Sequence, residues 1–150
     1  MDKKYMCYCG LYCENCATKA RVEPAAKSLY AEMKKAGFEE IMQFLPGGDA
    51  FWPFLKNMAE GGTCDSCREE GGNPGCGVRI CAKEKEAEMC ALCGEYPCAN
   101  FAAFFEGYPM LEQDNALLRD GGLDAWARLQ DERLVSGYAY SDREADAGEN

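Results

Sequence analysis

The sequence predicts a small, mainly α-helical single domain with few short strands and an irregular, cysteine-rich middle that is stapled by metal. Three observations support this fold class. Seven of the eleven cysteines fall within residues 64–98, apolar residues elsewhere recur at helical spacing, and no segment sustains an alternation of apolar and polar residues. With 150 residues, a single domain (1–150) that buries a modest core is expected.

A first helix is predicted between Pro24 and Gly37. Proline suits the first helical position, and Leu29 and Met33 recur at i and i+4. Glycine ends the pattern because it accepts the left-handed conformation of a helix C-terminus. These features indicate an amphipathic helix with one buried face.

A second amphipathic helix is predicted after Asp49, which is a suitable N-cap. Gly61-Gly62 ends its pattern and leads the chain to the cysteine-rich middle. We interpret its apolar stripe as core rather than as a ligand pocket, because apolar residues at helical spacing usually face the interior. The stripe consists of Phe51, Phe54, Leu55 and Met58.

Further helices are predicted towards the C-terminus. Residues 82–88 read as a short charged helix, 99–106 as a helix that leaves the cysteine-rich middle, and 106–140 as a helical extension interrupted at Gly121-Gly122. The polar, acidic tail at 141–150 is expected to fray. The expected core consists of Leu29, Met33, Phe51, Phe54, Leu55, Phe101, Phe104, Leu123 and Trp126.

The cysteine spacing predicts metal binding. A Cys-x-x-Cys turn brings two thiolates onto one ion, and two such turns complete a tetrahedral site. Histidine is absent, so every soft ligand is sulfur, and closed thiolate sites favour zinc. We therefore expect two structural zinc sites, and the spacing leaves the grouping of the cysteines open. The Cys-x-x-Cys pairs are Cys13/Cys16, Cys64/Cys67 and Cys90/Cys93.

Two redox alternatives stay open for the same cysteines. One is an iron–sulfur cluster, although ferredoxin-type clusters use denser cysteine runs. The other is a dithiol that cycles with a disulfide, although the βαβ context of a thioredoxin-like site is missing. The spacing of Cys9, Cys13 and Cys16 also resembles the cluster loop of radical S-adenosylmethionine enzymes, but the chain is too short for their barrel.

Composition limits the classes of binding partner and the cellular compartment that we expect. A formal net charge of −10 argues against nucleic acid, since an acidic protein repels phosphate backbones. Arg68, Arg79 and Lys83 are expected to offset the negative charge of nearby thiolates. No apolar run of about 18 residues suggests a membrane span. The N-terminus lacks the apolar region of a signal peptide and eleven cysteines is an odd number, so we expect a cytoplasmic protein with reduced thiols rather than disulfides.

The sequence contains no recognisable catalytic set. Without histidine, the commonest general base and the Cys–His nucleophile pair are unavailable, and no phosphate-binding glycine loop occurs. This argues against an enzyme. The interpretation that remains is a structural zinc protein that acts through contacts with a protein partner whose identity the sequence leaves open.

The combined motifs resemble the DUF3795 family of cysteine-rich bacterial and archaeal proteins. The helical extension that follows them resembles that of some members. Members of the family have no assigned activity, so the resemblance implies zinc binding without implying a reaction. The matching motifs, within residues 8–105, are YCGLYCENC, CDSC and CGVRICAKEKEAEMCALCGEYPCANF.

The resemblance implies ten metal-ligating cysteines. Where members often carry Cys-x-x-Cys, this chain has Asn73-Pro74-Gly75-Cys76, so one potential ligand is missing and a fixed quartet assignment stays open. Cys7 lies outside the motif and is interpreted as a spare thiol. The implied ligands are Cys9, Cys13, Cys16, Cys64, Cys67, Cys76, Cys81, Cys90, Cys93 and Cys98.

Overall fold

The computed structural model describes residues 1–142, apart from the side chains of residues 103 and 104. Over these residues the chain is mainly helical, as predicted. The pairing of extended residues in this part of the chain is limited to an isolated antiparallel bridge between Met6 and Tyr12. No helix in the described part of the chain combines the length and apolar character that crossing a bilayer requires. Most of the tail predicted at 141–150 lies outside the described residues.

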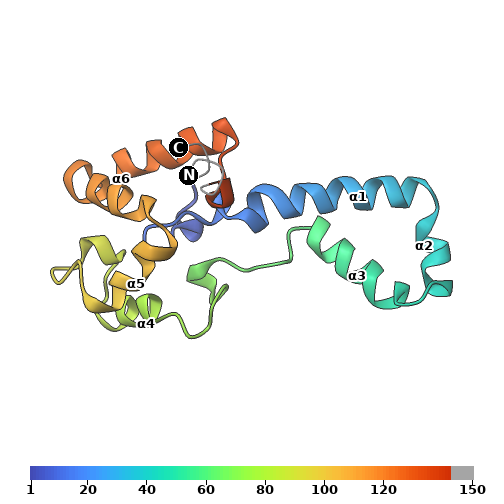
Figure 1. Ribbon diagram of the computed structural model, residues 1–150, viewed down its shortest axis with the longest axis horizontal. Helices are drawn as coiled ribbons and strands as arrows, with labels where there is room; N and C mark the ends of the chain where they lie inside the picture. Colours follow the sequence, from blue (N-terminus) through green and yellow to red (C-terminus); the bar gives the residue numbers. More distant parts are fainter. Residues whose placement is uncertain (143–150) are drawn as a thin grey trace.

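The molecule has two regions of different character (Figure 1). A body, which we define as residues 1–22 and 63–142, contains α4, α5 and α6 together with the N-terminal loop. An arm, which we define as residues 23–62, projects from one side of the body and contains α1, α2 and α3. All eleven cysteines belong to the body.

The arm is an antiparallel helical hairpin. Gly37 and Gly47 adopt φ values of 79° and 76°, which glycine accepts without strain, and they allow the two changes of direction at its tip. Near the base, a π-helical turn at Thr18–Val22 leads from the body into the hairpin. The helical elements of the arm are α1 (Glu23–Lys35), α2 (Phe38–Ile41), the 3₁₀ turn Met42–Phe44 and α3 (Gly48–Ala59).

A narrow seam holds α1 against α3. Ala26 and Leu55 are buried in it, and the rings of Tyr30 and Trp52 lie with their centroids 4.9 Å apart. The seam therefore follows one row of side chains on each helix. These rows are Ala26, Tyr30 and Met33 on α1, and Trp52, Leu55 and Ala59 on α3.

The predicted stripe on α3 is displaced by one residue from the row that faces α1. Leu55 belongs to both rows and is buried, but the Phe51 and Phe54 side chains are 40% and 59% exposed. On α1, Leu29 is 48% exposed. These three core predictions are wrong, because each helix of a projecting hairpin has only one neighbour to cover it.

The core of the body agrees better with the prediction. Phe101 and Trp126 are fully buried, and Leu123 packs beside Trp126. In the arm, Met33 is half-buried. The side chain of Phe104, the remaining predicted core residue, lies outside the described residues.

The helices of the body differ from the prediction mainly at their ends. The short helix predicted over 82–88 instead begins at Gly77, so it contains Cys81 and ends before the charged run does. The break predicted at Gly121-Gly122 is confirmed, because Gly122 has φ 76° and ψ −179° and Gln130 and Arg133 after it reach back to Asp114, so α6 consists of two helices. These helices are α4 (Gly77–Glu84), α5 (Ala99–Gly107) and α6 (Met110–Ser136).

A buried polar network fixes the N-terminal loop against α6. The side-chain oxygen of Gln130 accepts hydrogen bonds from the Asn15 amide at 3.0 Å and from the Tyr140 hydroxyl at 3.2 Å. The backbone N–H of Tyr12 in turn donates to the Tyr140 hydroxyl at 2.9 Å. Because buried polar groups are costly to leave unpaired, this network holds the cysteine-bearing loop in a defined position.

Candidate functional site

Four cysteines from three elements line one small cavity, which we call the four-thiol cavity. Its volume is about 20 Å³. Because a water molecule needs roughly 10–15 Å³ of such space, the cavity has room for about one ion and not for an organic substrate. The four cysteines are Cys81 in α4, Cys90 and Cys93 in the turn after it, and Cys98 just before α5.

The same backbone turn forms two of the three Cys-x-x-Cys pairs. The N–H of Cys93 donates to the carbonyl oxygen of Cys90 at 3.0 Å, and the N–H of Cys16 donates to that of Cys13, also at 3.0 Å. Each turn is 3₁₀-helical, and both cysteines of each pair line the same cavity. The local geometry that the spacing predicts is therefore present at both pairs.

Electrostatics in the four-thiol cavity disfavour a lone thiolate at Cys90. Burial raises the pKa of Cys90 to about 12, and the neighbouring thiols, that of Cys9 first among them, add to this rise. At the rim, Lys85 forms an ion pair with Glu95 and lies close enough to Cys81 for that thiol to help raise the lysine pKa. Several thiols crowded together can all ionise only when a cation compensates their charge, which is what a bound metal ion supplies.

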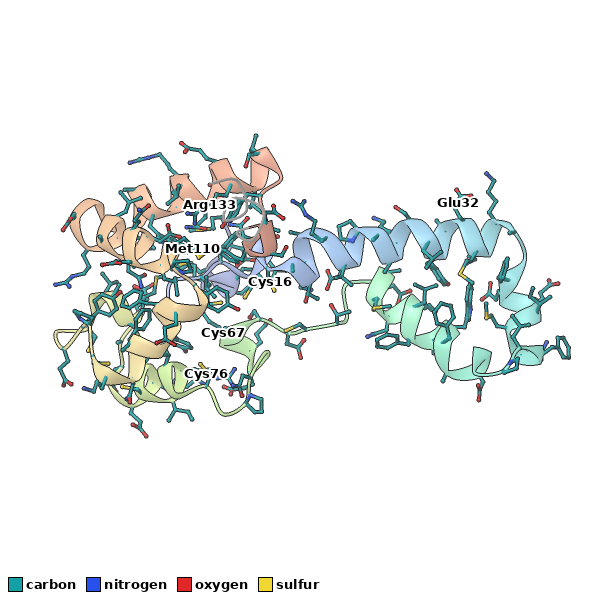
Figure 2. All side chains as sticks on the ribbon, in the orientation of Figure 1. Cys16, Glu32, Cys67, Cys76, Met110 and Arg133 are labelled. Carbon is teal, nitrogen blue, oxygen red and sulfur yellow. The ribbon has the colours of Figure 1, made fainter. Side chains whose placement is uncertain are left out.

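A second cavity lies where the arm meets the body, and we call it the arm-base cavity. Its volume is about 50 Å³, and Cys13, Cys16 and Cys64 line it together with Asp65 and Ser66. In Figure 2, Cys16 lies where the chain leaves the body for α1, and Cys67 lies on the segment that returns from α3. The cavity therefore lies between two segments that are far apart in the sequence.

Cys7, which the sequence leaves outside the motif as a spare thiol, lies beside Cys13, one of the thiols that line this cavity. Its Sγ lies 3.3 Å from the Sγ of Cys13. The neighbouring thiols of Cys13, Cys67 and Cys9, in that order of importance, raise the pKa of the Cys7 thiol. The Cys-x-Cys spacing of Cys7 and Cys9 is the signal in the sequence that could have placed Cys7 beside the motif cysteines.

Hydrogen bonds favour thiolates at two of these neighbours. Hydrogen bonding with Cys7 lowers the pKa of Cys67 to about 6 against the opposing effect of burial, and Arg79 and Arg68 contribute to the lowering. Hydrogen bonding with Cys7 likewise lowers the pKa of Cys13 to about 7. A lowered pKa makes a thiol a better metal ligand, because the thiolate is the form that binds.

Two of the three cations expected beside the cysteines also hold the thiol-bearing segments in place. Arg79 is buried and donates to the backbone carbonyls of Gly71 at 2.6 Å and Asn73 at 2.9 Å, so it fixes the loop that precedes α4. Arg68 donates to the carbonyls of Met6 and Glu88 at 2.8 and 2.7 Å. Lys83, the third cation, pairs with Glu70.

The two remaining predicted ligands lie apart from the cavities. Cys9 is buried between the two groups of thiols, in the core cluster that also contains Cys7 and Cys90. Gly10 beside it has φ 101°, and a Cβ there would lie 2.1 Å from the Asn115 side chain, so the turn requires glycine. Cys76 packs against the same core at the start of α4 and is not among the residues that line either cavity.

The thiols share cavities without forming a finished cage. Within the part of the chain that the structure describes, no group of three or more Cys, Asp or Glu side chains is arranged as it stands to hold a metal ion. All eleven cysteines are free thiols. The chemistry of the donors fits a soft metal ion, but binding would require the thiols to rotate towards a common centre.

The arm carries an exposed apolar face beside its seam. The rows that lie one residue before the seam rows include Leu29 on α1 and Phe51 and Phe54 on α3, all exposed. Because the two helices run in opposite directions, rows displaced from the seam in the same sequence sense lie on the same side of the pair. The rows one residue after the seam form the other side, and their charged residues are Lys27, Lys34, Lys56 and Glu60.

The tip of the hairpin adds further exposed apolar residues. Phe44 is 78% exposed, and Ile41 and Leu45 are each 44% exposed. Acidic side chains lie beside these residues, with Glu39 and Glu40 exposed on α2. The arm therefore presents apolar residues bordered by negative charge.

Comparison with curated proteins and with solved structures returns no match. A family model described as "Protein of unknown function (DUF3795)" matches residues 5–103. This match covers more than half of the chain and includes all eleven cysteines. The chain therefore belongs to the DUF3795 family, as its motifs predicted.

Proposed function

We propose that this protein is a non-catalytic zinc-binding protein whose metal ions stabilise the body and whose arm binds a protein partner. The observation that carries the metal proposal is the four-thiol cavity, where Cys81, Cys90, Cys93 and Cys98 meet around a space of about 20 Å³. Zinc is held in closed structural sites by four thiolates, and such sites contribute directly to folding.

Zinc fits the size of the cavity better than an iron–sulfur cluster does. A cubane cluster brings eight iron and sulfide atoms, whereas the cavity has room for about one ion. A dithiol redox pair is the other alternative, and the free state of all eleven cysteines is compatible with it. We place the protein in the cytoplasm, where thiols of this kind stay reduced.

Metal analysis of protein purified without oxygen tests the metal proposal. We expect colourless protein that contains zinc, and we expect Cys93→Ser to lose one zinc ion per chain. Cys76→Ser is the matched control, because Cys76 lies outside both cavities, and it should retain the zinc of the wild type. Brown protein with stoichiometric iron and absorbance near about 400 nm would show that the bound group is an iron–sulfur cluster and not zinc. Equal zinc in both variants would refute the four-thiol site.

The partner proposal rests on the exposed face and tip of the arm. Exposed apolar patches bordered by polar residues mark interaction sites, and aromatic residues dominate the energy of such contacts. Glu32 lies in the same row as Leu29, and Glu39 and Glu40 border the tip. The charge-complementary occupant is a basic amphipathic helix of a partner protein, which would lie along the apolar row and complete a three-helix layer.

A model peptide tests this occupant. We expect a helical peptide of leucine and lysine, with its leucines on one face, to bind the wild-type protein and perturb the fluorescence of Trp52. A leucine–glutamate peptide of the same length should bind much more weakly, and Phe51→Ser/Phe54→Ser should abolish binding. Equal binding of both peptides would contradict the charge argument, and a concentration-dependent dimer in sedimentation would show that a second copy is the occupant.

A further inference from the structure

The arm leaves and rejoins the body at two Cys-x-x-Cys pairs. The chain runs from Cys16 through a single π-helical turn into α1, and it returns from α3 to Cys64 after a short glycine-containing linker. Cys16 and Cys64 are both exposed, and both line the arm-base cavity with Cys13. Two segments 48 positions apart in the sequence thus bring thiols to one place at the root of the arm.

A fourth thiol lies next to the same cavity. Cys67 directly follows Ser66, which lines the cavity, and it neighbours Cys7, whose Sγ lies 3.3 Å from that of Cys13. The two pairs therefore supply Cys13, Cys16, Cys64 and Cys67, which is the complement of ligands that a tetrahedral thiolate site requires. The volume of about 50 Å³ corresponds to roughly three to five waters by the same measure, which is enough for an ion and its ligands and small for an organic ligand.

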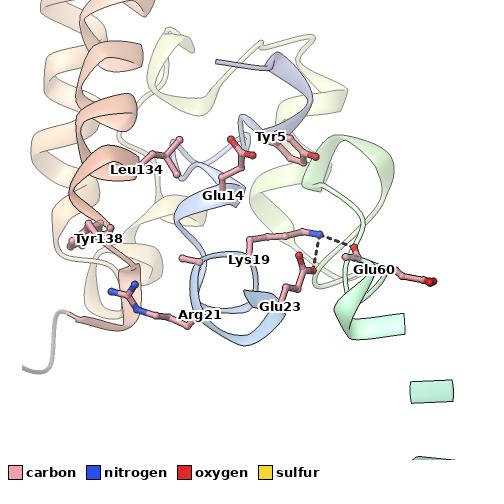
Figure 3. Close-up of a pocket in the computed structure, with 11 residues that line it drawn as sticks. Tyr5, Glu14, Lys19, Arg21, Glu23, Glu60, Leu134 and Tyr138 are labelled. Atoms are coloured by element: carbon pink, nitrogen blue, oxygen red, sulfur yellow. Dashed lines mark hydrogen bonds and ion pairs between the residues drawn. The ribbon is translucent and has the colours of Figure 1, made fainter. Parts of the chain in front are cut away.

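Without a metal ion, a few polar contacts connect the two ends of the arm. Figure 3 shows Lys19 reaching from the entry of the arm towards its exit. The Lys19 ammonium pairs with Glu23 at 2.8 Å and donates to the carbonyl of Gly61 at 2.9 Å, and the Thr63 hydroxyl donates to Glu23. These contacts lie beside a cavity of about 480 Å³ between the arm and the body, so the junction is loosely packed.

We propose that a metal ion bound by Cys13, Cys16, Cys64 and Cys67 clasps the two ends of the arm and thereby sets the position of the arm relative to the body. The inference rests on the metal binding proposed above and adds a regulatory consequence. Loading of this clasp fixes the apolar face of the arm in the orientation that the partner meets. Loss of the ion leaves the α1–α3 hairpin held to the body by the chain itself and by the polar contacts of Lys19 and Thr63, which allows the arm to swing.

Two double variants, each lacking two thiols of one proposed site, test the clasp. Cys16→Ser/Cys64→Ser removes the two exposed ligands of the clasp, and Cys81→Ser/Cys93→Ser removes two ligands of the four-thiol cavity. Zinc per chain is measured for both variants and the wild type, and amide hydrogen exchange is followed at residues 17–22 and 60–63. The full chain is used throughout, under anaerobic conditions.

We expect two zinc ions in the wild type and one in each variant. Exchange at both ends of the arm should accelerate about tenfold or more in Cys16→Ser/Cys64→Ser and clearly less in the control, whose lost site lies away from the base of the arm, because local opening sets the exchange rate. Should the double variant fail to fold, Cys64→Ser alone removes one exposed ligand and should accelerate exchange in the same two segments.

Two results would overturn the clasp. One is full zinc in Cys16→Ser/Cys64→Ser, and the other is loss of one zinc ion with unchanged exchange at the base of the arm. A wild type with a single zinc ion that only the control variant loses would refute the clasp and leave the proposed zinc protein standing. A wild type without metal would refute both.

Discussion

The body and the arm are stabilised by different kinds of interaction. The body buries Trp126, Phe101 and Leu118 completely, carries every cysteine and uses a buried polar network. The arm has no cysteine and buries little more than Ala26, Met42 and Leu55, while it exposes phenylalanines. The difference agrees with the proposed division of labour, in which metal at the thiols stabilises the body and the hairpin keeps its apolar face available.

Truncation of a large aromatic side chain in each region should give the largest contrast. We expect Trp126→Ala to lower the free energy of unfolding by about 3–5 kcal/mol, because the side chain is fully buried and its removal leaves a cavity. Phe54→Ala in the arm, at 59% exposed, should cost about 0.5 kcal/mol or less. Urea unfolding of the zinc-loaded protein measures both. Equal losses would mean that the exposed face of the arm contributes to the fold.

The loss of an ion pair should likewise cost more stability in the body than in the arm. Arg133 donates to the buried carboxylate of Asp114, with one N–O distance of 2.9 Å, so Arg133→Met would leave that charge without its partner. We expect a loss of about 3 kcal/mol in unfolding free energy. The matched change in the arm is Lys56→Met, which removes an exposed pair with Glu60 at 3.9 Å and should cost about 0.5 kcal/mol or less. A small effect of Arg133→Met would show that solvent reaches Asp114.

Several local elements of both regions could be predicted from the sequence. Spacing within a Cys-x-x-Cys pair fixes a local turn, so the turns at Cys13/Cys16 and Cys90/Cys93 follow from the sequence alone. Helical periodicity likewise located α1, α3 and the kink at Gly122. The geometry of a turn or a helix depends on residues that are close in the sequence, and that is why these elements could be predicted.

The burial of apolar faces and the grouping of the thiols depend on tertiary packing, which the sequence does not show. These are the features that stayed open or were predicted wrongly. A helical stripe such as that of Phe51 and Phe54 indicates an apolar face but does not identify the element that covers it. The grouping of the thiols depends on how the N-terminal loop folds back. Cys7 joins Cys13 and Cys67 only because that loop docks beside Cys90, whose N–H donates to the carbonyl of Tyr8 at 2.7 Å.

Thiol reactivity should distinguish positions within the body, with a smaller effect. Measured directly after a brief chelator pulse, before the body unfolds, Cys67 and Cys13 have pKa values lowered to about 6 and about 7, so they carry thiolate at neutral pH, and their alkylation should slow as the pH falls through those values. Cys90, with a pKa raised to about 12, should stay protonated and react last. Peptide mass spectrometry after iodoacetamide treatment measures the order. Early labelling of Cys90 would contradict the described arrangement of the thiols.

In the arrangement that we propose, metal at the thiols holds the body together, whereas the α1–α3 seam holds the hairpin of the arm. The two tryptophans report these regions separately, since Trp126 lies in the core of the body and Trp52 lies against Tyr30 in the arm. Fluorine NMR of protein labelled with 5-fluorotryptophan, assigned with Trp52→Phe, follows both during chelation of the metal. We expect the Trp126 signal to move to its unfolded position at chelator concentrations that leave the Trp52 signal in place. Removal of all metal with no change at Trp126, or movement of both signals together, would contradict the account.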